Sequence, residues 1–208
     1  MPLASDIFVH AQALCESAEV GVGTRIWAFA HVMKGAVIGR DCIVGGHAFL
    51  ESGCRIGDRV TIKNQAMIWS GVEIDDDVFV GPGVTFTNDP LPRSPRMLFP
   101  PIAERYGDRA RWLLPTRIER GASLGARCVI LAGITVGAYA MVAAGAVVTR
   151  NVTAHSLAVG APARRVGWTC RCGERLALLM ANTWRCPRCG ERFNRDTAAA
   201  CINPVKSY

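Results

Sequence analysis

Several features that often reveal the class of a protein are scarce in this 208-residue sequence. Aromatic residues make up only 7% of it. Its net charge is +7, but the sequence contains no run of five or more basic residues. Surfaces that bind nucleic acid concentrate Lys and Arg, so this pattern favours small phosphorylated ligands over DNA or RNA. The first ten residues contain neither a basic region nor a long apolar stretch, so we expect no secretory signal and a cytoplasmic protein.

One apolar stretch, residues 129–148, is long enough to suggest a membrane span. Glycines interrupt it, and a six-residue pattern continues through it, so we interpret it as the buried interior of a protein without a membrane segment. The nine cysteines would suggest disulfides in a short secreted chain. Three of them, Cys42, Cys54 and Cys128, instead recur within the six-residue pattern as small apolar residues.

The dominant feature of the sequence is an aliphatic residue, in one case Phe, at every sixth position. These residues are Val20, Ile26, Val32, Ile38, Val44, Leu50, Ile56, Ile62, Ile68, Ile74, Val80, Phe86 and, after an interruption, Ile118, Leu124, Ile130, Val136, Val142 and Val148. A period of six matches neither a helix nor a simple strand, but it fits a coil of short parallel strands with a corner every six residues. The aliphatic side chains would stack inside the coil, and frequent glycines would relieve backbone strain at the corners.

This hexapeptide pattern covers residues 14–165 and resembles that of the hexapeptide-repeat acyltransferases. The resemblance implies a mainly β fold, a left-handed parallel β-helix, a homotrimer, and active sites in clefts between subunits. We therefore predict a β-helix domain over residues 1–166 and a small appendage over residues 167–208. Regular aliphatic ladders can also build an inert rod, so the repeat alone predicts a fold and not a function.

Four cysteines of the appendage form two knuckles, Cys170-Arg-Cys172-Gly and Cys186-Pro-Arg-Cys189-Gly. Four thiolates that converge on one tetrahedral ion are typical of structural zinc, and the Gly after each second cysteine permits a tight turn. Because four protein ligands leave no open coordination position, we predict a zinc-ribbon-like structural site and not a catalytic one. A redox pair, or a knuckle that has lost its metal, is the alternative.

The six-residue phase breaks after Phe86, which predicts an inserted loop over about residues 88–117 with a short helix at 102–114. A long loop on a rigid solenoid is usually functional or disordered, and its aromatic residues argue against simple disorder. The loop opens with Thr85-Phe-Thr-Asn-Asp89-Pro-Leu-Pro-Arg93. Three further segments are distinctive together with this one: Ile62-Lys-Asn-Gln65, Asp75-Asp-Asp-Val-Phe-Val-Gly-Pro82 and Gly160-Ala-Pro-Ala-Arg164-Arg165.

Together these segments resemble the N-acetyltransferases that act on nucleotide-linked 3-amino sugars, some of which carry a similar cysteine tail. The resemblance implies transfer of an acetyl group from acetyl-CoA to the 3-amino group of a UDP- or dTDP-linked amino sugar, in the synthesis of surface polysaccharides or deoxysugars. The residues after Asn88 depart from the branch that acts on uronic acids. A dTDP-linked 3-amino-6-deoxysugar is therefore a serious rival to a uronate substrate.

The resemblance also implies roles for individual residues. Asn88 would hydrogen-bond near the reacting amine and thioester, and the departing CoA thiolate would collect the proton. A base role for the adjacent Asp89 stays open, and Asn88 before Asp-Pro also suits a turn that leaves the coil. The expected contacts to CoA are Ala126, Ala143 and Ala144 along the pantetheine arm and Arg164 and Arg165 near the phosphates. The expected contacts to the nucleotide sugar are Lys63, Asn64 and Arg93.

Several alternatives remain at this stage. The alanines would also serve tight packing, and the arginine pair would also suit a solvated surface. His31 and His47 lie at coil positions that can face outward, but the sequence pairs neither with an orienting carboxylate, and we expect surface or packing roles. The three-histidine spacing of γ-type carbonic anhydrases is absent. Acyl transfer to a hydroxyl group, or a non-catalytic β-helix with a zinc-dependent binding module, are the other functions that the sequence allows.

Overall fold

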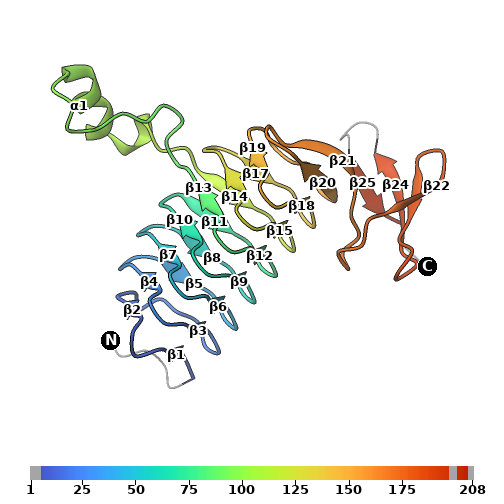
Figure 1. Ribbon diagram of the computed structural model, residues 1–208, viewed down its shortest axis with the longest axis horizontal. Helices are drawn as coiled ribbons and strands as arrows, with labels where there is room; N and C mark the ends of the chain where they lie inside the picture. Colours follow the sequence, from blue (N-terminus) through green and yellow to red (C-terminus); the bar gives the residue numbers. More distant parts are fainter. Residues whose placement is uncertain (1–5, 197–200, 206–208) are drawn as a thin grey trace.

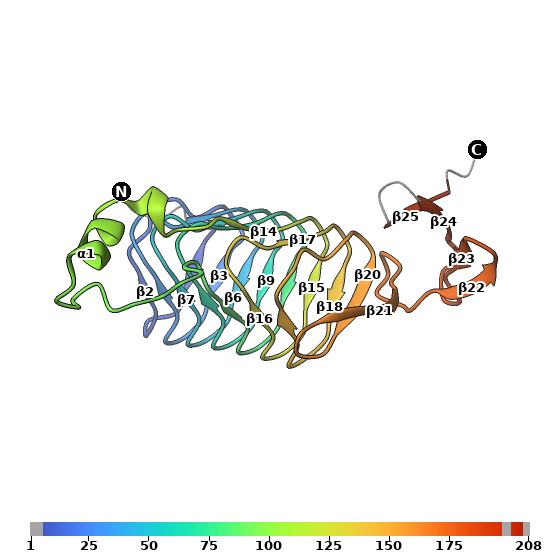
Figure 2. The ribbon, with the colours of Figure 1, turned by 90° about the horizontal axis from the view of Figure 1, so that it is seen from above.

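The computed structural model describes residues 6–196 and 201–205, so the outer ends of both predicted domains, residues 1 and 208, lie outside it. Most of the chain forms a left-handed parallel β-helix of about eight turns, which is the predicted fold (Figure 1). Short strands alternate with tight corners, and three strands complete one turn (Figure 2). Strands one turn apart pair with each other, and this pairing produces three sheets, which we name A, B and C.

The chain passes from sheet A to sheet B to sheet C in each turn. Sheet A contains β1 (Phe8–Val9), β3 (Arg25–Ile26), β6 (Ile43–Val44), β9 (Thr61–Ile62), β12 (Phe79–Val80), β15 (Ser123–Leu124), β18 (Met141–Val142), β20 (Ser156–Val159) and β21 (Arg164–Trp168). Sheet B contains β2 (Leu14–Cys15), β4 (His31–Val32), β7 (Phe49–Leu50), β10 (Met67–Ile68), β13 (Thr85–Phe86), β16 (Val129–Ile130) and β19 (Val147–Val148). Sheet C contains β5 (Val37–Ile38), β8 (Arg55–Ile56), β11 (Val72–Ile74), β14 (Thr116–Ile118) and β17 (Thr135–Val136).

The corners that follow each sheet line up as three edges of a triangular prism. The A–B edge comprises residues 27–29, 45–47, 63–65, 81–83, 125–127 and 143–145. The B–C edge comprises residues 33–35, 51–53, 69–71, 87–89 and 131–133. The C–A edge comprises residues 21–23, 39–41, 57–59, 75–77, 119–121 and 137–139. The edges matter because they, and not the buried interior, present the polar and aromatic side chains.

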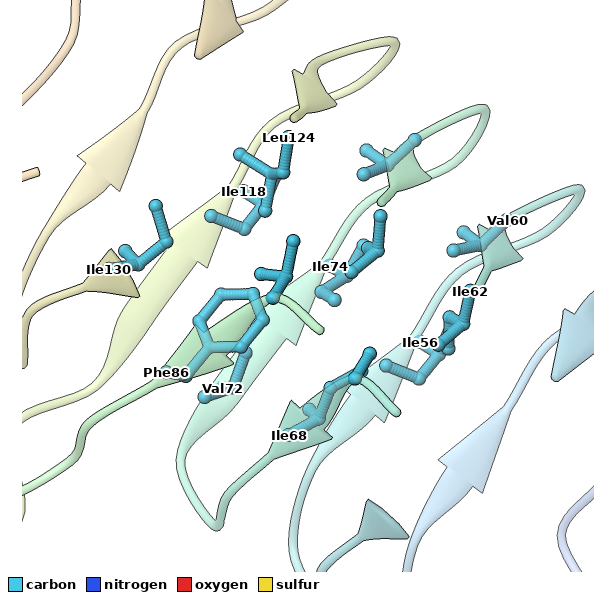
Figure 3. Packing of buried hydrophobic residues seen from close by; sticks show 14 of the residues in the cluster. Ile56, Val60, Ile62, Ile68, Val72, Ile74, Phe86, Ile118, Leu124 and Ile130 are labelled. Atoms are coloured by element: carbon cyan, nitrogen blue, oxygen red, sulfur yellow. The ribbon is translucent and has the colours of Figure 1, made fainter. Parts of the chain in front are cut away.

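The interior of the prism is filled by the residues that recur every six positions. From Ile26 to Val148 every one of them is buried, and Val20 in the first turn is half-buried. Figure 3 shows such side chains, among them Ile62 and Ile68, stacked in layers along the axis. Burial of a Val, Leu or Ile side chain is worth about 1.5–3 kcal/mol, so this continuous ladder holds the turns together.

The predicted core cysteines are confirmed as small apolar side chains of this interior. Cys42, Cys54 and Cys128 are fully buried and unpaired. Burial raises the pKa of Cys54 and of Cys128 to about 12, so both remain thiols at neutral pH.

The apolar stretch 129–148 is part of the same interior. It folds into β16, β17, β18 and β19 with a corner between each pair. Among the residues that the structure describes, no helix has the length and apolar character needed to cross a membrane.

The glycines serve two purposes, and this corrects the interpretation that all of them relieve backbone strain. The glycine directly after an inward aliphatic residue, such as Gly39 or Gly137, does not have a positive φ angle. A Cβ on Gly137 would lie 2.5 Å from the backbone nitrogen of Ala154 in the next turn. Only the third residue after the aliphatic one is left-handed, as Gly145 (φ 68°) and His47 (φ 59°) are.

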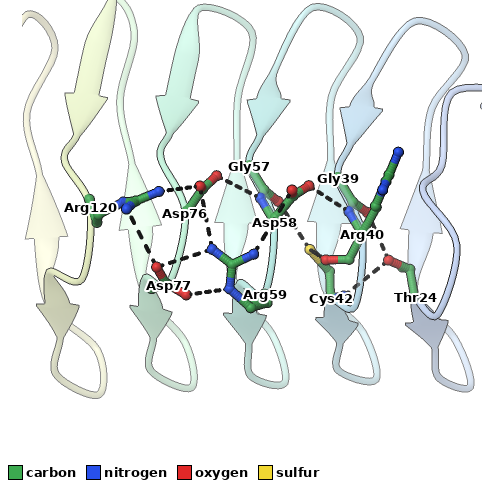
Figure 4. Close-up of polar contacts among 10 residues, drawn as sticks. All are labelled: Thr24, Gly39, Arg40, Cys42, Gly57, Asp58, Arg59, Asp76, Asp77 and Arg120. Carbon is green, nitrogen blue, oxygen red and sulfur yellow. Dashed lines mark hydrogen bonds and ion pairs between the residues drawn. The ribbon is translucent and has the colours of Figure 1, made fainter.

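The C–A edge is charged, and its carboxylates connect successive turns (Figure 4). Asp58 Oδ1 accepts the backbone N–H of Arg40 at 2.8 Å, and Asp76 Oδ1 accepts that of Asp58 at 2.9 Å. The bond from the Asp58 N–H, together with an ion pair to Arg120 at 2.6 Å, lowers the pKa of Asp76. The Asp-rich segment 75–77 therefore joins turns on this edge.

The inserted loop leaves the prism after β13 and returns at β14 (Figure 1). It contains α1 (Pro100–Gly107) and one 3-10 turn, η1 (Arg109–Arg111). The predicted helix at 102–114 is therefore too long, and it also begins two residues late. Proline is well tolerated in the first turn of a helix, and the Asp108 carboxylate starts a new turn by accepting the Ala110 N–H at 3.0 Å.

The appendage has a small core of its own. An antiparallel sheet is formed by β22 (Ala177–Met180), β23 (Thr183–Arg185), β24 (Arg192–Asp196) and β25 (Cys201–Pro204). Its buried residues are Trp168, Cys170, Leu176, Cys186, Phe193 and Ile202. The buried ring of His155 stacks on Tyr139 of the last turns and meets Phe193 edge-on at 5.0 Å. Strand β21 pairs antiparallel with β20, so sheet A continues past residue 166 to Trp168.

The two classes of glycine predict different responses to a methyl group. Gly137→Ala is expected to lower the free energy of unfolding by about 3 kcal/mol or more, because the Cβ would press on backbone that cannot yield. Gly145→Ala is the matched control, since nothing lies within 4 Å of its Cβ. Its left-handed backbone alone should cost about 1–2 kcal/mol. Denaturant unfolding measures both variants, and equal losses would contradict the distinction.

Candidate functional site

The residues predicted to carry function lie on two different edges of the prism and at its C-terminal end. The B–C edge holds Asn88 and Asp89, where the inserted loop begins. The A–B edge holds Lys63, Asn64, Ala126, Ala143 and Ala144. Arg164 and Arg165 lie in β21, and Arg93 lies in the loop. Sheet B separates the two edges, so one chain does not bring the two groups together.

A pocket of about 410 Å³ lies on the B–C edge, beneath the returning end of the loop. Its lining consists of Met33, Glu51, Ser52, Trp69, Ser70, Asn88, Arg109 and Trp112. Of these residues, only Asn88 was predicted to be functional. Trp112 and Arg109 come from the loop, about twenty residues after Asn88, and their proximity depends on how the loop folds back.

Ser70 organises this pocket. Its carbonyl oxygen accepts a hydrogen bond from Asn88 Nδ2 at 3.2 Å, and its N–H donates to Glu51 Oε2 at 2.8 Å. Its hydroxyl group is hydrogen-bonded to the guanidinium of Arg109. Within the described part of the chain, Asn88 Oδ1 has no hydrogen bond, so it is free to accept one from a ligand amine. An amide can orient an amine but cannot take its proton, because it is not a base at neutral pH.

Asp89 holds the inserted loop instead of facing this pocket. Its carboxylate is 9% exposed and forms an ion pair with Arg105 of α1. The hydroxyl of Tyr106 and the N–H of Leu91 donate to the same carboxylate. Burial acts to raise the pKa of Asp89, but the hydrogen bonds from Arg105, Tyr106 and Leu91 bring it below its ordinary value. The geometry therefore favours a loop-anchoring role for Asp89 over the open base role.

A second pocket, of about 430 Å³, lies on the A–B edge in the early turns. Its side-chain lining includes His10, Trp27, Phe29, His47, Lys63 and Asn64. The rings of Phe29 and His47 are stacked, with centroids 4.9 Å apart. Further along the same edge, Ala126, Ala143 and Ala144 present nothing larger than a methyl group, and they are half-buried or exposed. This edge therefore offers a lined pocket followed by a path of small residues.

The C-terminal end of the prism has a smaller basic pocket of about 210 Å³. Arg164 and Arg165 line it as predicted neighbours, and Arg150 joins them from the last turn. The Arg165 guanidinium also lies 4.1 Å above the ring of Trp168. Three arginines line this concavity, and guanidinium groups suit an anion with several phosphates. Arg93 lines none of the pockets described, and its guanidinium donates to the Pro92 carbonyl oxygen.

The structure pairs one histidine with a carboxylate that the sequence did not associate with it. His31 Nε2 lies 3.1 Å from Glu16 Oε2 on the outer face of sheet B. The two residues are 15 positions apart and meet because β2 and β4 are adjacent strands. Both side chains are partly exposed, and His31 lies three strands from β13, which precedes Asn88.

The four knuckle cysteines converge in the appendage. Their sulfur atoms all lie within 4.8 Å of one another, with Sγ–Sγ distances of 3.5 Å for Cys170–Cys189 and for Cys172–Cys186. Four thiolates at about 2.3 Å from a tetrahedral zinc would have a similar mutual spacing. Gly173 (φ 87°) and Gly190 (φ 79°) follow the knuckles in left-handed turns, as predicted. The donor set therefore fits structural zinc, which remains a prediction.

Comparisons with known proteins agree with this architecture. A family model of the bacterial transferase hexapeptide (six repeats) matches residues 17–52 and 53–88, and one of the hexapeptide repeat of succinyl-transferase matches residues 115–150. Over 186 residues the chain is 44% identical to dTDP-3-amino-3,6-dideoxy-alpha-D-galactopyranose 3-N-acetyltransferase from Aneurinibacillus thermoaerophilus. That match covers 89% of this chain and 90% of that protein.

More distant similarities are shorter or weaker. The chain is 32% identical over 162 residues to the bifunctional protein GlmU of Nitratidesulfovibrio vulgaris (strain DSM 19637 / Miyazaki F), covering 73% of this chain but only 32% of that protein. The crystal structure of a hexapeptide transferase family protein from Anaplasma phagocytophilum has a TM-score of 0.53 at 14% identity. That match covers 81% of this chain and 78% of the other, and it supports the fold alone.

The cysteine cluster predicts bound zinc that depends on the knuckles. Protein purified with zinc under reducing conditions should contain about one equivalent per chain by elemental analysis. Cys186→Ser should lose most of that metal and destabilise the appendage, whereas Cys15→Ser should retain it. Cobalt substitution should produce the absorption of a tetrathiolate site. Metal-free protein with an intact fold would contradict the prediction.

The Asp89 ion pair predicts a loop whose order depends on that carboxylate. Because the pKa of Asp89 is lowered, its contribution is present above the unfolded value of about 4 and is lost as the pH falls through the lower folded value. At neutral pH, Asp89→Asn should speed tryptic cleavage within residues 88–115 several-fold. Asp108→Asn, which affects an exposed pair in the same loop, should not. Equal cleavage rates in both variants would remove the anchoring role.

Proposed function

The chain belongs to the hexapeptide-repeat acetyltransferases, and we propose that it transfers the acetyl group of acetyl-CoA to the 3-amino group of a dTDP-linked 3-amino-3,6-dideoxyhexose. The observation that carries this proposal is the 44% identity to a protein named for that reaction. A match over 89% of 208 residues necessarily includes residues 24–185. It therefore spans the inserted loop and both edges that hold the candidate residues.

The chemistry requires positioning more than proton transfer by the protein. The neutral amine attacks the thioester carbonyl, a C–N bond forms, the C–S bond breaks, and CoA leaves as a thiolate. The thiolate can take the proton that the amine loses, so the products are an amide and free CoA. Asn88, held by Ser70, would orient the amine through its free Oδ1. Among the described residues that line the B–C pocket there is no histidine, and its carboxylate, Glu51, already accepts the Ser70 N–H.

The separation of the two edges supports a homotrimer. If Asn88 and the alanine path serve one reaction, the second edge must come from a neighbouring subunit, because sheet B lies between them in one chain. The outer faces of sheets A and B carry exposed apolar side chains, including Phe8, Leu14 and Ile43. Sheet C instead presents ion-paired residues such as Arg117. Sheets A and B are therefore the faces that would pack in a closed ring.

Acetyl-CoA would lie along the later turns. Methyl side chains at Ala126, Ala143 and Ala144 would let the pantetheine arm approach the backbone. The pocket of Arg150, Arg164 and Arg165 would receive the phosphates. Zinc would stabilise the appendage without taking part in the transfer. Both substrates belong to cytoplasmic metabolism, so we place the protein in the cytoplasm.

Turnover tests the proposal. Purified protein is incubated with acetyl-CoA and a panel of dTDP- and UDP-linked 3-amino sugars, and free thiol is followed. Thiol release with a dTDP sugar, and an amide product by mass spectrometry, are expected. Asn88→Ala should lower kcat roughly 100-fold, the loss expected when a reacting group is no longer held in position. His31→Gln, the control on sheet B, should remain close to the unaltered enzyme.

Each part of the proposal has an outcome that contradicts it. Absence of thiol release with every amine would exclude the acetyltransferase assignment, and an ester product would indicate a hydroxyl acceptor. A loss of activity in His31→Gln equal to that in Asn88→Ala would indicate a protein base. Light scattering of the same samples should give three times the chain mass of 22.4 kDa, and a single-chain mass would exclude the trimer.

A further inference from the structure

We propose that the early A–B pocket binds the pyrimidine base and diphosphate of the nucleotide sugar. This pocket, which we call the aromatic pocket, is defined by the side chains of His10, Trp27, Phe29, His47, Lys63 and Asn64. The inference rests on the proposed function, because it names the part of the substrate that this edge would hold. It assigns the recognition of the nucleotide to side chains separate from Asn88.

The aromatic pocket places two rings at the left-handed corner position. Phe29 (φ 62°) and His47 (φ 59°) both occupy the left-handed corner position, in consecutive turns. Later turns of the same edge carry Gln65 (φ 62°), Gly83, Arg127 (φ 55°) and Gly145 at this position. A bulky residue in this conformation is disfavoured relative to glycine. Other non-glycine residues, such as Asp41 and Arg59, share this conformation on another edge, so the two aromatic rings, and not the backbone alone, distinguish the pocket.

Packing within the chain leaves the large side chains of this pocket partly exposed. Phe29 is 52% exposed and Trp27 is 43% exposed, although both are large apolar side chains. Tyr139, at an equivalent left-handed corner, differs because its ring stacks on the buried His155. The stacked rings of Phe29 and His47, tilted by 21°, thus present a flat aromatic surface without an internal partner for its open side. Bases stack on such surfaces.

Two polar side chains in the next turn complete the recognition of a nucleotide. Among the described residues, neither the Lys63 ammonium nor the Asn64 amide has an ion pair or a side-chain hydrogen bond. An amide supplies both a donor and an acceptor, which matches the carbonyl and N–H groups of thymine or uracil. An ammonium group suits a diphosphate. The sequence predicted that Lys63 and Asn64 contact the nucleotide sugar, and the inference assigns both to its nucleotide part.

The position of the pocket along the edge fits the rest of the substrate. Asn64 and Ala126 are two turns apart on the A–B edge, which corresponds to about 10 Å at the spacing of paired strands. A base bound in the aromatic pocket would direct its diphosphate and sugar toward the later turns, where the alanine path begins. The amino sugar would then lie between the nucleotide site and the thioester.

The test uses dTDP as the probe and glycine as the substitution. Phe29→Gly removes the ring but suits the left-handed corner, so the fold should be retained. Calorimetry should show dTDP binding roughly tenfold weaker, as expected for loss of one stacking partner, with CoA affinity unchanged. Lys63→Ala should weaken dTDP but not thymidine. Asp41→Gly, at a left-handed corner (φ 55°) of the C–A edge, is the matched control and should bind dTDP normally.

Several results would overturn the inference. One is an unchanged dTDP affinity in Phe29→Gly. A second is a selective loss of CoA affinity in that variant, which would place adenine in the pocket. A third is dissociation of the assembly, detected by light scattering, which would assign the Phe29 ring to a subunit interface. Failure of the proposed function is distinguishable from these. If dTDP binding depends on Phe29 while no amino sugar is acetylated, the nucleotide pocket stands and the acetyl-transfer assignment is wrong.

Discussion

The stacking of one turn directly on the next is the constraint on which the whole structure depends. Parallel strands pair at a spacing of about 4.8 Å, and the aliphatic residues keep that spacing by filling the interior without gaps. Each residue therefore lies above its equivalent in the preceding turn, and side chains at equivalent positions form a column along the axis. This explains why the three edges differ chemically: carboxylates and guanidiniums on the C–A edge, aromatic and small residues on the A–B edge, and the loop on the B–C edge.

This constraint also explains what the sequence could predict. Inward positions repeat at a fixed interval in the sequence. Their spacing therefore predicted the buried ladder from Ile26 to Val148, the core cysteines and the interruption of the repeat by the loop. The knuckle cysteines were legible because their spacing is local and chemically specific. The sequence did not reveal the two roles of the glycines. A Gly that allows a close approach of two turns and a Gly that adopts a positive φ cannot be told apart from the sequence alone. Only neighbouring turns distinguish Gly137 from Gly145.

The candidate site was predicted less completely for a related reason. Asn88 was found through its resemblance to a motif, but Arg109 and Trp112 reach the same pocket through the path of a loop without periodicity. Glu16 and His31 meet across adjacent strands, a relation that requires the strand register. The pairing of Asp89 with Arg105 likewise depends on where α1 lies. Edges repeat and can be anticipated, whereas contacts made by an irregular loop have no register from which to infer them.

The position of the loop shows how such a frame accommodates function. Ile118 occupies the place that residue 92 would hold in an unbroken repeat, six positions after Phe86, so the loop adds 26 residues within one turn. The turn is nevertheless undisturbed, since Ile118 pairs in register with Ile74 on one side and Val136 on the other. A solenoid tolerates this because the two ends of a corner are already close, and the entropy of loop closure rises only slowly with length. The ion pair between Asp89 and Arg105 is one of the local contacts that offset part of the cost of ordering the loop. Loop and edge residues can therefore change ligand contacts while the stacked interior, which specifies the fold, remains the same.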